Sequence, residues 1–188
     1  MTNQAPDVSV SLSALISRAE RAGKGAPPVE RWNPDFCGDV DMVIRADGTW
    51  LYQGTPIRRE ALKRLFSSVL RKDEDGRTYL VTPVEKLGIT VEDAPFLAVE
   101  MSREERAGES VLTFRTDVGD VVEAGKDHPI RFGEEAEAFR PYLLVRGRLE
   151  AALSRALAID LADLVEEDEG GMFVRSGGAR FSLPTGVS

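Results

Sequence analysis

The 188-residue chain has little of the chemistry that redox and metal-dependent proteins use, because it contains one cysteine, Cys37, and one histidine, His128. One cysteine cannot form an intramolecular disulfide. A zinc site of cysteine and histidine ligands needs more donors than these two residues supply. The histidine lies in a predicted turn without a serine or cysteine motif, so the sequence indicates no nucleophilic triad. We expect no disulfide framework, no resident metal and no cofactor.

Positive charge is also scarce, because 24 Lys and Arg stand against 32 Asp and Glu, a formal net charge of −8. An acidic surface repels nucleic-acid phosphates and anionic lipids, so neither a nucleic acid nor a membrane is expected as a partner. No apolar run approaches the ~20 residues that span a bilayer. Residues 1–7 lack the basic and apolar stretches of a secretion signal. We therefore expect a cytoplasmic protein.

Apolar sequence is nevertheless sufficient for a core, because hydrophobic residues make up 42% of the chain and charged residues 30%. The length fits one large domain or two small ones. We expect a tail with an amphipathic helix at 1–25, an N-terminal unit at 26–92 and a C-terminal unit at 93–188. The helix is capped by Ser11 and runs to about Ala22. Its apolar face must pack either on its own core or on a partner subunit, as in a homodimer.

A hairpin is predicted from strands at 41–45 and 49–53, with its turn at Ala46-Asp47-Gly48. A two-residue loop would mix large side chains between the two faces of the hairpin. A three-residue loop, with Gly48 in the left-handed conformation, places them all on one face. It pairs Ile44 with Trp50 and Met42 with Tyr52. We therefore predict the three-residue loop.

The rest of the N-terminal unit is predicted from its periodicity. After a corner at residues 54–56, apolar residues at helical spacing predict a helix over 57–71. Strands are expected over 77–82 and 84–91, with Gly88 as a bulge. These elements form a ββαββ unit.

The C-terminal half is expected to begin with a meander of short strands and a helical turn near 134–139. Then the earlier order returns, with a strand at 142–145, a helix at 149–165 and a hairpin closing around 176–178. The sequence E-A-L-K-R at 60–64 also resembles E-A-A-L-S-R at 150–155, which favours duplication. We predict an α+β fold of two related sheet-plus-helix units (a ββαββ repeat) with mostly antiparallel strands.

Positive charge at the two expected helix starts is the main candidate for function. Arg58 and Arg59 follow the first corner, and Arg146 and Arg148 hold the same place in the second unit. Cations there oppose the helix dipole by ~0.3–1 kcal/mol each, whereas free N–H groups and guanidinium groups together form an anion site. Surface salt bridges are the alternative. Two corners facing one cleft between the units would suit a small anionic ligand such as a nucleotide, although the chain has no glycine-rich phosphate loop.

Four further residues are candidates for the same ligand site. Trp32 and Trp50 could stack on a ligand, although aromatic side chains more often serve burial. Glu85 and Lys86 lie in the turn between two predicted strands. They could line a pocket, or they could be exposed charges at a β-bulge.

Several longer motifs resemble one family, and they extend over most of the chain. They are W-N-P at 32–34, D-G-T-W-L-Y-Q-G-T-P-I-R-R at 47–59, L-V-T-P-V-E-K at 80–86, V-E-D-A-P-F at 91–96 and P-Y-L-L-V-R-G at 141–147. Together they resemble the bacterial domain of unknown function 1285 family. The resemblance implies a duplicated α+β protein, a C-terminal half similar to pleckstrin-homology folds, and a nucleotide-like ligand at the interdomain surface. It also implies a role in signal transduction or stress response, without an established activity.

The leading hypothesis is a non-enzymatic ligand-binding or sensor protein that holds a small anion at the arginine corners. One alternative is a protein–protein interaction module that uses the N-terminal helix or a sheet edge. Another is a hydrolase of a small phosphate or ester compound, which would need polar side chains converging in a deep cleft.

Overall fold

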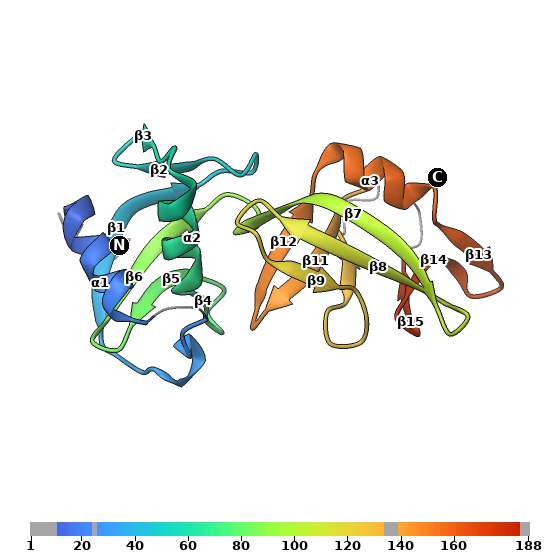
Figure 1. Ribbon diagram of the computed structural model, residues 1–188, viewed down its shortest axis with the longest axis horizontal. Coiled ribbons are helices and arrows are strands. Elements are labelled where there is room, and N and C mark those ends of the chain that lie inside the picture. Colours follow the sequence, from blue (N-terminus) through green and yellow to red (C-terminus); the bar gives the residue numbers. More distant parts are fainter. Residues whose placement is uncertain (1–10, 24–25, 134–138, 185–188) are drawn as a thin grey trace, which may run out of the picture. The chain divides into compact units, whose positions relative to one another are not determined.

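The computed structural model describes residues 11–23, 26–133 and 139–184 (Figure 1). The chain forms two compact units, Met1–Asp93 and Ala94–Ser188. Each unit contains a six-stranded sheet with few helices, and the described strands pair mostly in antiparallel fashion. The predicted α+β class is confirmed. The expectations for residues 1–7 and for a helical turn near 134–139 concern segments that lie wholly or mostly outside the described residues.

Unit 1 places two helices against a sheet with the strand order β3-β2-β1-β6-β5-β4. Its elements are α1 (Leu12–Arg21), the 3-10 helix η1 (Val29–Arg31), β1 (Phe36–Ile44), β2 (Trp50–Tyr52), β3 (Thr55–Pro56), α2 (Glu60–Ser68), β4 (Leu70–Lys72), β5 (Thr78–Thr82) and β6 (Glu85–Val91). Strand β1 pairs antiparallel with β2 and parallel with β6.

The predicted register of the β1–β2 hairpin is confirmed. Ile44 pairs with Trp50 and Met42 with Tyr52, and all four side chains are buried. The loop closes where Arg45 N donates to Thr49 O (2.9 Å). Gly48 has φ +84°, the left-handed conformation that the three-residue loop requires.

Helix α1 packs on the core of its own unit. The Ser11 hydroxyl accepts a hydrogen bond from Ala14 N (3.3 Å) and caps the helix as predicted. Leu15 and Ala19 are each only 3% exposed. Arg18 donates to Glu85 Oε2 on β6 (2.8 Å). The apolar face of α1 is therefore covered within its own unit.

Helix α2 is shorter than the predicted 57–71, because it begins at Glu60 and ends at Ser68. The hydroxyls of Ser67 and Ser68 donate to the carbonyls of Arg64 and Leu65 (2.8 and 2.6 Å). Such bonds compete with continued helix formation. The chain then turns directly into β4, which pairs with β5.

Unit 2 contains a six-stranded sheet of order β10-β11-β12-β7-β8-β9 and a separate sheet of order β13-β14-β15. Its elements are β7 (Phe96–Arg106), β8 (Glu109–Thr116), β9 (Val121–Glu123), β10 (Ile130–Phe132), β11 (Pro141–Arg146), β12 (Leu149–Leu153), α3 (Arg155–Ala162), β13 (Glu166–Asp168), β14 (Gly171–Ser176) and β15 (Ala179–Ser182).

The predicted helix over 149–165 is wrong in its first third. Residues Leu149–Leu153 form β12, with Leu149, Ala151 and Leu153 buried in alternation. This strand pairs with β11 on one side and with β7 on the other. Tertiary pairing thus overrides the helix propensity of alanine. The helix begins only after Ser154, whose hydroxyl accepts a hydrogen bond from Leu157 N (3.4 Å).

The internal repeat holds in element order but not in pairing. Apart from the two-residue strand β3, which has no counterpart in unit 2, a hairpin, a helix and three strands recur as β1–β2, α2, β4–β6 and as β11–β12, α3, β13–β15. However, β5 and β6 join the main sheet of unit 1, whereas β13–β15 form a sheet of their own. The sequence match of 60–64 with 150–155 pairs a helix with a strand.

No described helix is long and apolar enough to cross a membrane.

Candidate functional site

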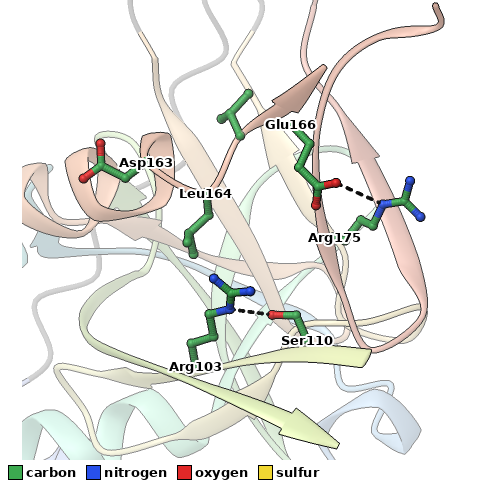
Figure 2. A pocket seen from close by; sticks show the side chains of 7 residues that line it. Arg103, Ser110, Asp163, Leu164, Glu166 and Arg175 are labelled. Atoms are coloured by element: carbon green, nitrogen blue, oxygen red, sulfur yellow. Dashed lines mark hydrogen bonds and ion pairs between the residues drawn. The ribbon is translucent and has the colours of Figure 1, made fainter. Parts of the chain in front are cut away.

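A polar cleft in unit 2 lies where the end of the β7–β8 hairpin meets the segment after α3 and the β13–β15 sheet (Figure 2). It consists of two adjoining hollows of about 240 and 340 Å³, which share Ser110, Glu166 and Arg175. The first is also lined by Arg103, Asp163, Leu164 and Val165. The second is also lined by Glu105, Gly108, Glu109, Gly178, Ala179 and Arg180. We refer to both hollows together as the unit 2 cleft.

A buried serine fixes the two walls of the cleft to each other. Ser176 is 0% exposed; its hydroxyl accepts from Leu112 N (2.8 Å) and donates to Ala124 O (2.7 Å). One residue further, Gly177 N donates to Ser110 O (2.9 Å). A Cβ on Gly177 would lie 3.0 Å from Ala124 O, so only glycine allows this close approach. The β14–β15 turn is therefore bonded directly to β8.

The arginines of the cleft already have carboxylate partners. Arg103 Nε donates to Ser110 Oγ (2.9 Å), and its Nη2 donates to Glu105 Oε1 (3.3 Å). Arg175 Nε lies 3.6 Å from Glu166 Oε2. Figure 2 shows that Arg103 and Ser110 come from the hairpin, and that Glu166 and Arg175 come from the small sheet.

Arg180 forms the tightest of these pairs. Its two terminal nitrogens donate to the Asp168 carboxylate at 2.5 and 2.8 Å, and its guanidinium lies 3.6 Å from the Phe173 ring centroid. These charge-assisted hydrogen bonds, with one from Gly170 N, lower the pKa of Asp168 to about 2. Arg180 is thus held in place by two contacts, the ion pair with Asp168 and the cation–π contact with the Phe173 ring.

Two lining carboxylates differ, because they have no hydrogen bond or ion pair within the described part of the chain. They are Glu109, at the start of β8, and Asp163, the C-cap of α3. The Glu109 carboxylate lies so close to Gly178 that a Cβ there would be 3.1 Å from Glu109 Oε2. Both side chains are exposed. The cleft therefore offers unpaired negative charge and paired positive charge.

The arginines predicted in unit 1 are exposed and adjacent. Arg59 is the N-cap of α2, and its side chain makes no capping hydrogen bond. Neither Arg58 nor Arg59 forms an ion pair with another described residue. The nearest lysine on the helix, Lys63, pairs with Glu60 instead (2.9 Å). The predicted combination of a helix start and free guanidinium groups thus exists in unit 1.

The equivalent argument for Arg146 and Arg148 is wrong, because they lie at the β11–β12 turn and not at a helix start. A strand follows them, so no helix dipole acts on either residue. Arg146 Nη1 donates to Asp120 Oδ2 (2.9 Å), and its guanidinium lies 5.0 Å from the Phe96 ring centroid. Arg148 is exposed.

The other four predicted site residues belong to unit 1 and do not line the unit 2 cleft. Trp50 is buried in the core, and Trp32 is half-buried, with its carbonyl accepting from Arg71 (2.6 Å). Glu85 faces α1 through its ion pair with Arg18. Lys86 donates to Asp73 (3.1 Å) and lies over the Tyr79 ring. None of the cleft residues was a candidate site residue from the sequence, in which residues 102–109 stand out only as a run rich in charge, S-R-E-E-R-A-G-E.

Comparison with known proteins identifies the family. The N-terminal domain model of DUF1285, a domain of unknown function, matches residues 27–94, and the C-terminal domain model matches 95–183. A DUF1285 crystal structure from Silicibacter pomeroyi DSS-3 is 47% identical with a TM-score of 0.84, covering 94% of this chain and 96% of that chain. One from Shewanella baltica OS155 is 29% identical with a TM-score of 0.52, covering 65% and 90%. No curated protein matches. The chain belongs to the DUF1285 family, as its motifs indicated.

Proposed function

We propose that this protein binds a small polar ligand without chemically changing it, and that the unit 2 cleft is the binding site. The observation that carries the proposal is the bonded framework around Ser176, which holds β8 and the β14–β15 turn in fixed positions. A cleft that needs no rearrangement loses little entropy on binding. The larger hollow, about 340 Å³, is within the size range of small-molecule sites.

The chemistry of the cleft favours binding over catalysis. Ser110 is the hydroxyl that both hollows share, and its neighbour is the guanidinium of Arg103. A guanidinium does not lose its proton in proteins and cannot act as a general base. His128 instead lies 3.1 Å from the carbonyl of Leu144 and does not line the cleft. Cys37 belongs to unit 1. A sensor in cytoplasmic signal transduction or stress response would need only such a binding site.

The proposal is tested by filling the cleft. Ser110→Leu puts a bulky side chain at the position that both hollows share. Ser102→Leu is the matched control, because Ser102 is an exposed residue on β7 that lines neither hollow. Amide NMR spectra are recorded with diamines, amino acids, dicarboxylates and mononucleotides. We expect at least one class to shift the amides of Ser110, Glu166 and Gly178, and Ser110→Leu to abolish that shift. The proposal fails if none of the four classes shifts these amides.

A second candidate function is the binding of a nucleotide-like anion at Arg58 and Arg59. It is favoured by the absence of ion partners for these two exposed residues among the described residues. Thermal-shift measurements with mononucleotides test it, comparing Arg58→Ala/Arg59→Ala with Arg45→Ala, an exposed arginine of the same unit. We expect stabilisation that only the double variant loses. Equal stabilisation of all three proteins would refute it.

A further inference from the structure

We propose that one water molecule is bound between helix α1 and the β5–β6 hairpin, where it joins the hydroxyl of Thr82 to the carboxylate of Glu85. We call this position the α1 water site. Together with the ion pair between Arg18 and Glu85, the water attaches α1 to the sheet of unit 1. All three residues belong to unit 1, so the inference does not depend on the proposed function of the unit 2 cleft.

The hydroxyl of Thr82 is the observation that carries the inference. Thr82 is only 5% exposed, and its Oγ1 is buried without a hydrogen-bond partner among the described residues. A buried hydroxyl that gives up its hydration gains nothing in return unless another group bonds to it. Most buried side-chain polar atoms have such a partner, either in the protein or in an ordered water. Because no described protein group serves Thr82, we assign the partner to a water.

The structure has space for this partner beside Thr82. A cavity of about 10 Å³ lies between α1, α2 and the β5–β6 hairpin. Apolar side chains form most of its described lining, and the polar side chains of that lining are Arg18, Thr82 and Glu85. A cavity needs about 10–15 Å³ to hold one water molecule, which also needs two or more polar partners. The volume and the lining therefore match a single water.

The strand register brings two of these polar groups together. Thr82 on β5 pairs directly with Glu85 on β6, and Leu80 pairs with Leu87 next to them. Opposite residues of an antiparallel pair share one face of the sheet, with Cβ atoms about 4.5–5.5 Å apart. All four residues line the cavity, so this face is the one that α1 covers.

Glu85 has an acceptor to spare at this position. Its Oε2 accepts from Arg18 Nη1 (2.8 Å), and its other carboxylate oxygen has no hydrogen bond within the described residues. Thr82 does not bond to that oxygen directly. A water can accept the proton of the Thr82 hydroxyl and donate to the Glu85 carboxylate, and such a bridge is enthalpically nearly as good as a direct hydrogen bond.

The charges around the cavity select a neutral guest over an ion. The Glu85 side chain is only 12% exposed, so its carboxylate repels an anion, and the guanidinium of Arg18 beside it repels a cation. An apolar guest would leave the hydroxyl of Thr82 without a partner. A small neutral molecule that both donates and accepts hydrogen bonds meets all three conditions, and water does so at the available volume.

The water site bears on how α1 is held. Leu15 and Ala19 are the buried residues of this helix, so its apolar contact with the unit is small. The bridged group of Arg18, Glu85 and Thr82 adds a polar attachment at the same place. Loss of the water should therefore loosen α1 and leave the strands of unit 1 paired.

Relaxation dispersion of the oxygen-17 signal of water tests the site on the full chain, because it counts long-lived bound waters and hydroxyl protons do not contribute. We expect Thr82→Val, which keeps the shape of the side chain and removes its hydroxyl, to have one long-lived water fewer than the wild type. Thr82→Ser keeps the hydroxyl and should keep the water. Thr90→Val, at an exposed position of β6, is the matched control and should also keep it. Equal dispersion in the wild type and Thr82→Val overturns the inference.

Hydrogen exchange along α1 gives a second readout, in which the sign of the effect decides. If a water satisfies the Thr82 hydroxyl, Thr82→Val should speed exchange of the α1 amides by about fivefold or more, whereas Thr90→Val should leave it unchanged. If the hydroxyl has no partner at all, its removal relieves a buried unsatisfied group, and exchange should become slower. Unchanged or slower exchange in Thr82→Val therefore contradicts the water site. Neither outcome alters the tests of the unit 2 cleft.

Discussion

Ser176→Ala should destabilise unit 2 and loosen its cleft, because one hydroxyl satisfies two buried backbone groups. The variant leaves the N–H of Leu112 and the C=O of Ala124 without their present partner. An unsatisfied buried group costs about 1–3 kcal/mol, so we expect a loss of about 2–4 kcal/mol in the free energy of unfolding of unit 2. The side chain removed is small, so the cavity contribution is minor.

Hydrogen exchange monitored by NMR is the appropriate assay, because two units need not unfold in one two-state transition. The Leu112 amide and its neighbours on β8 should exchange faster, by the factor that corresponds to this loss in the free energy of unfolding. Ser182→Ala, at an exposed position of β15, is the control and should leave exchange on β8 unchanged. If Leu112 remains as protected in Ser176→Ala as in the wild type, the hydroxyl does not bridge the two walls, and the argument for a preformed cleft is refuted.

Three further predictions concern single groups. The pKa of Asp168 should be near 2 by NMR titration and return toward 3.8 in Arg180→Ala; this pair stabilises the fold above pH 4 and its contribution is lost as pH falls toward 2. Burial, aided by a hydrogen bond to Asp75, raises the pKa of Tyr79 to about 12, and burial also raises the pKa of Tyr52. Ultraviolet titration should therefore show tyrosine ionisation that extends to about pH 12, with the stabilisation from Tyr79 lost as pH rises from 10 through 12. Arg18→Ala removes the partner of the mostly buried Glu85 and should speed exchange along α1 by about 5–30-fold, corresponding to 1–2 kcal/mol; unchanged exchange would contradict a docking role for the ion pair.

The sequence was most informative where local rules and burial agreed. The β1–β2 hairpin followed from the requirement that Met42, Ile44, Trp50 and Tyr52 share one face, and that requirement permits one loop length. Helix α1 followed from its cap and its apolar spacing. In both cases the decisive residues lie within one short segment of the chain, from Met42 to Tyr52 for the hairpin and from Ser11 to Arg21 for the helix.

The prediction failed where a distant strand decided the outcome. Residues Leu149–Leu153 resemble a helix by composition, but pairing with β11 and with the distant β7 makes them a strand. Arg146 and Arg148 were therefore assigned to a helix start that does not exist. The sequence contains the pairing partner, but periodicity alone does not reveal which segments meet.

The unit 2 cleft could not be predicted for the same reason. Its residues come from the β7–β8 hairpin, the end of α3 and the β13–β15 sheet. In the sequence, Glu109 and Asp163 are ordinary exposed charges. The property that matters is that the neighbouring arginines pair with other carboxylates, and this depends on side-chain geometry.

The parallel pairing inside each six-stranded sheet has a consequence for the order of folding. Val43 pairs with Thr90 in unit 1, and Phe96 pairs with Ala151 in unit 2. Each contact joins segments far apart in the chain, so its formation is slow compared with that of the local hairpins. During synthesis, β1 must wait for β6, and β7 must wait for β12. Each sheet therefore keeps an open edge until its parallel partner has left the ribosome, and at this stage of biogenesis the edge is exposed to misassembly.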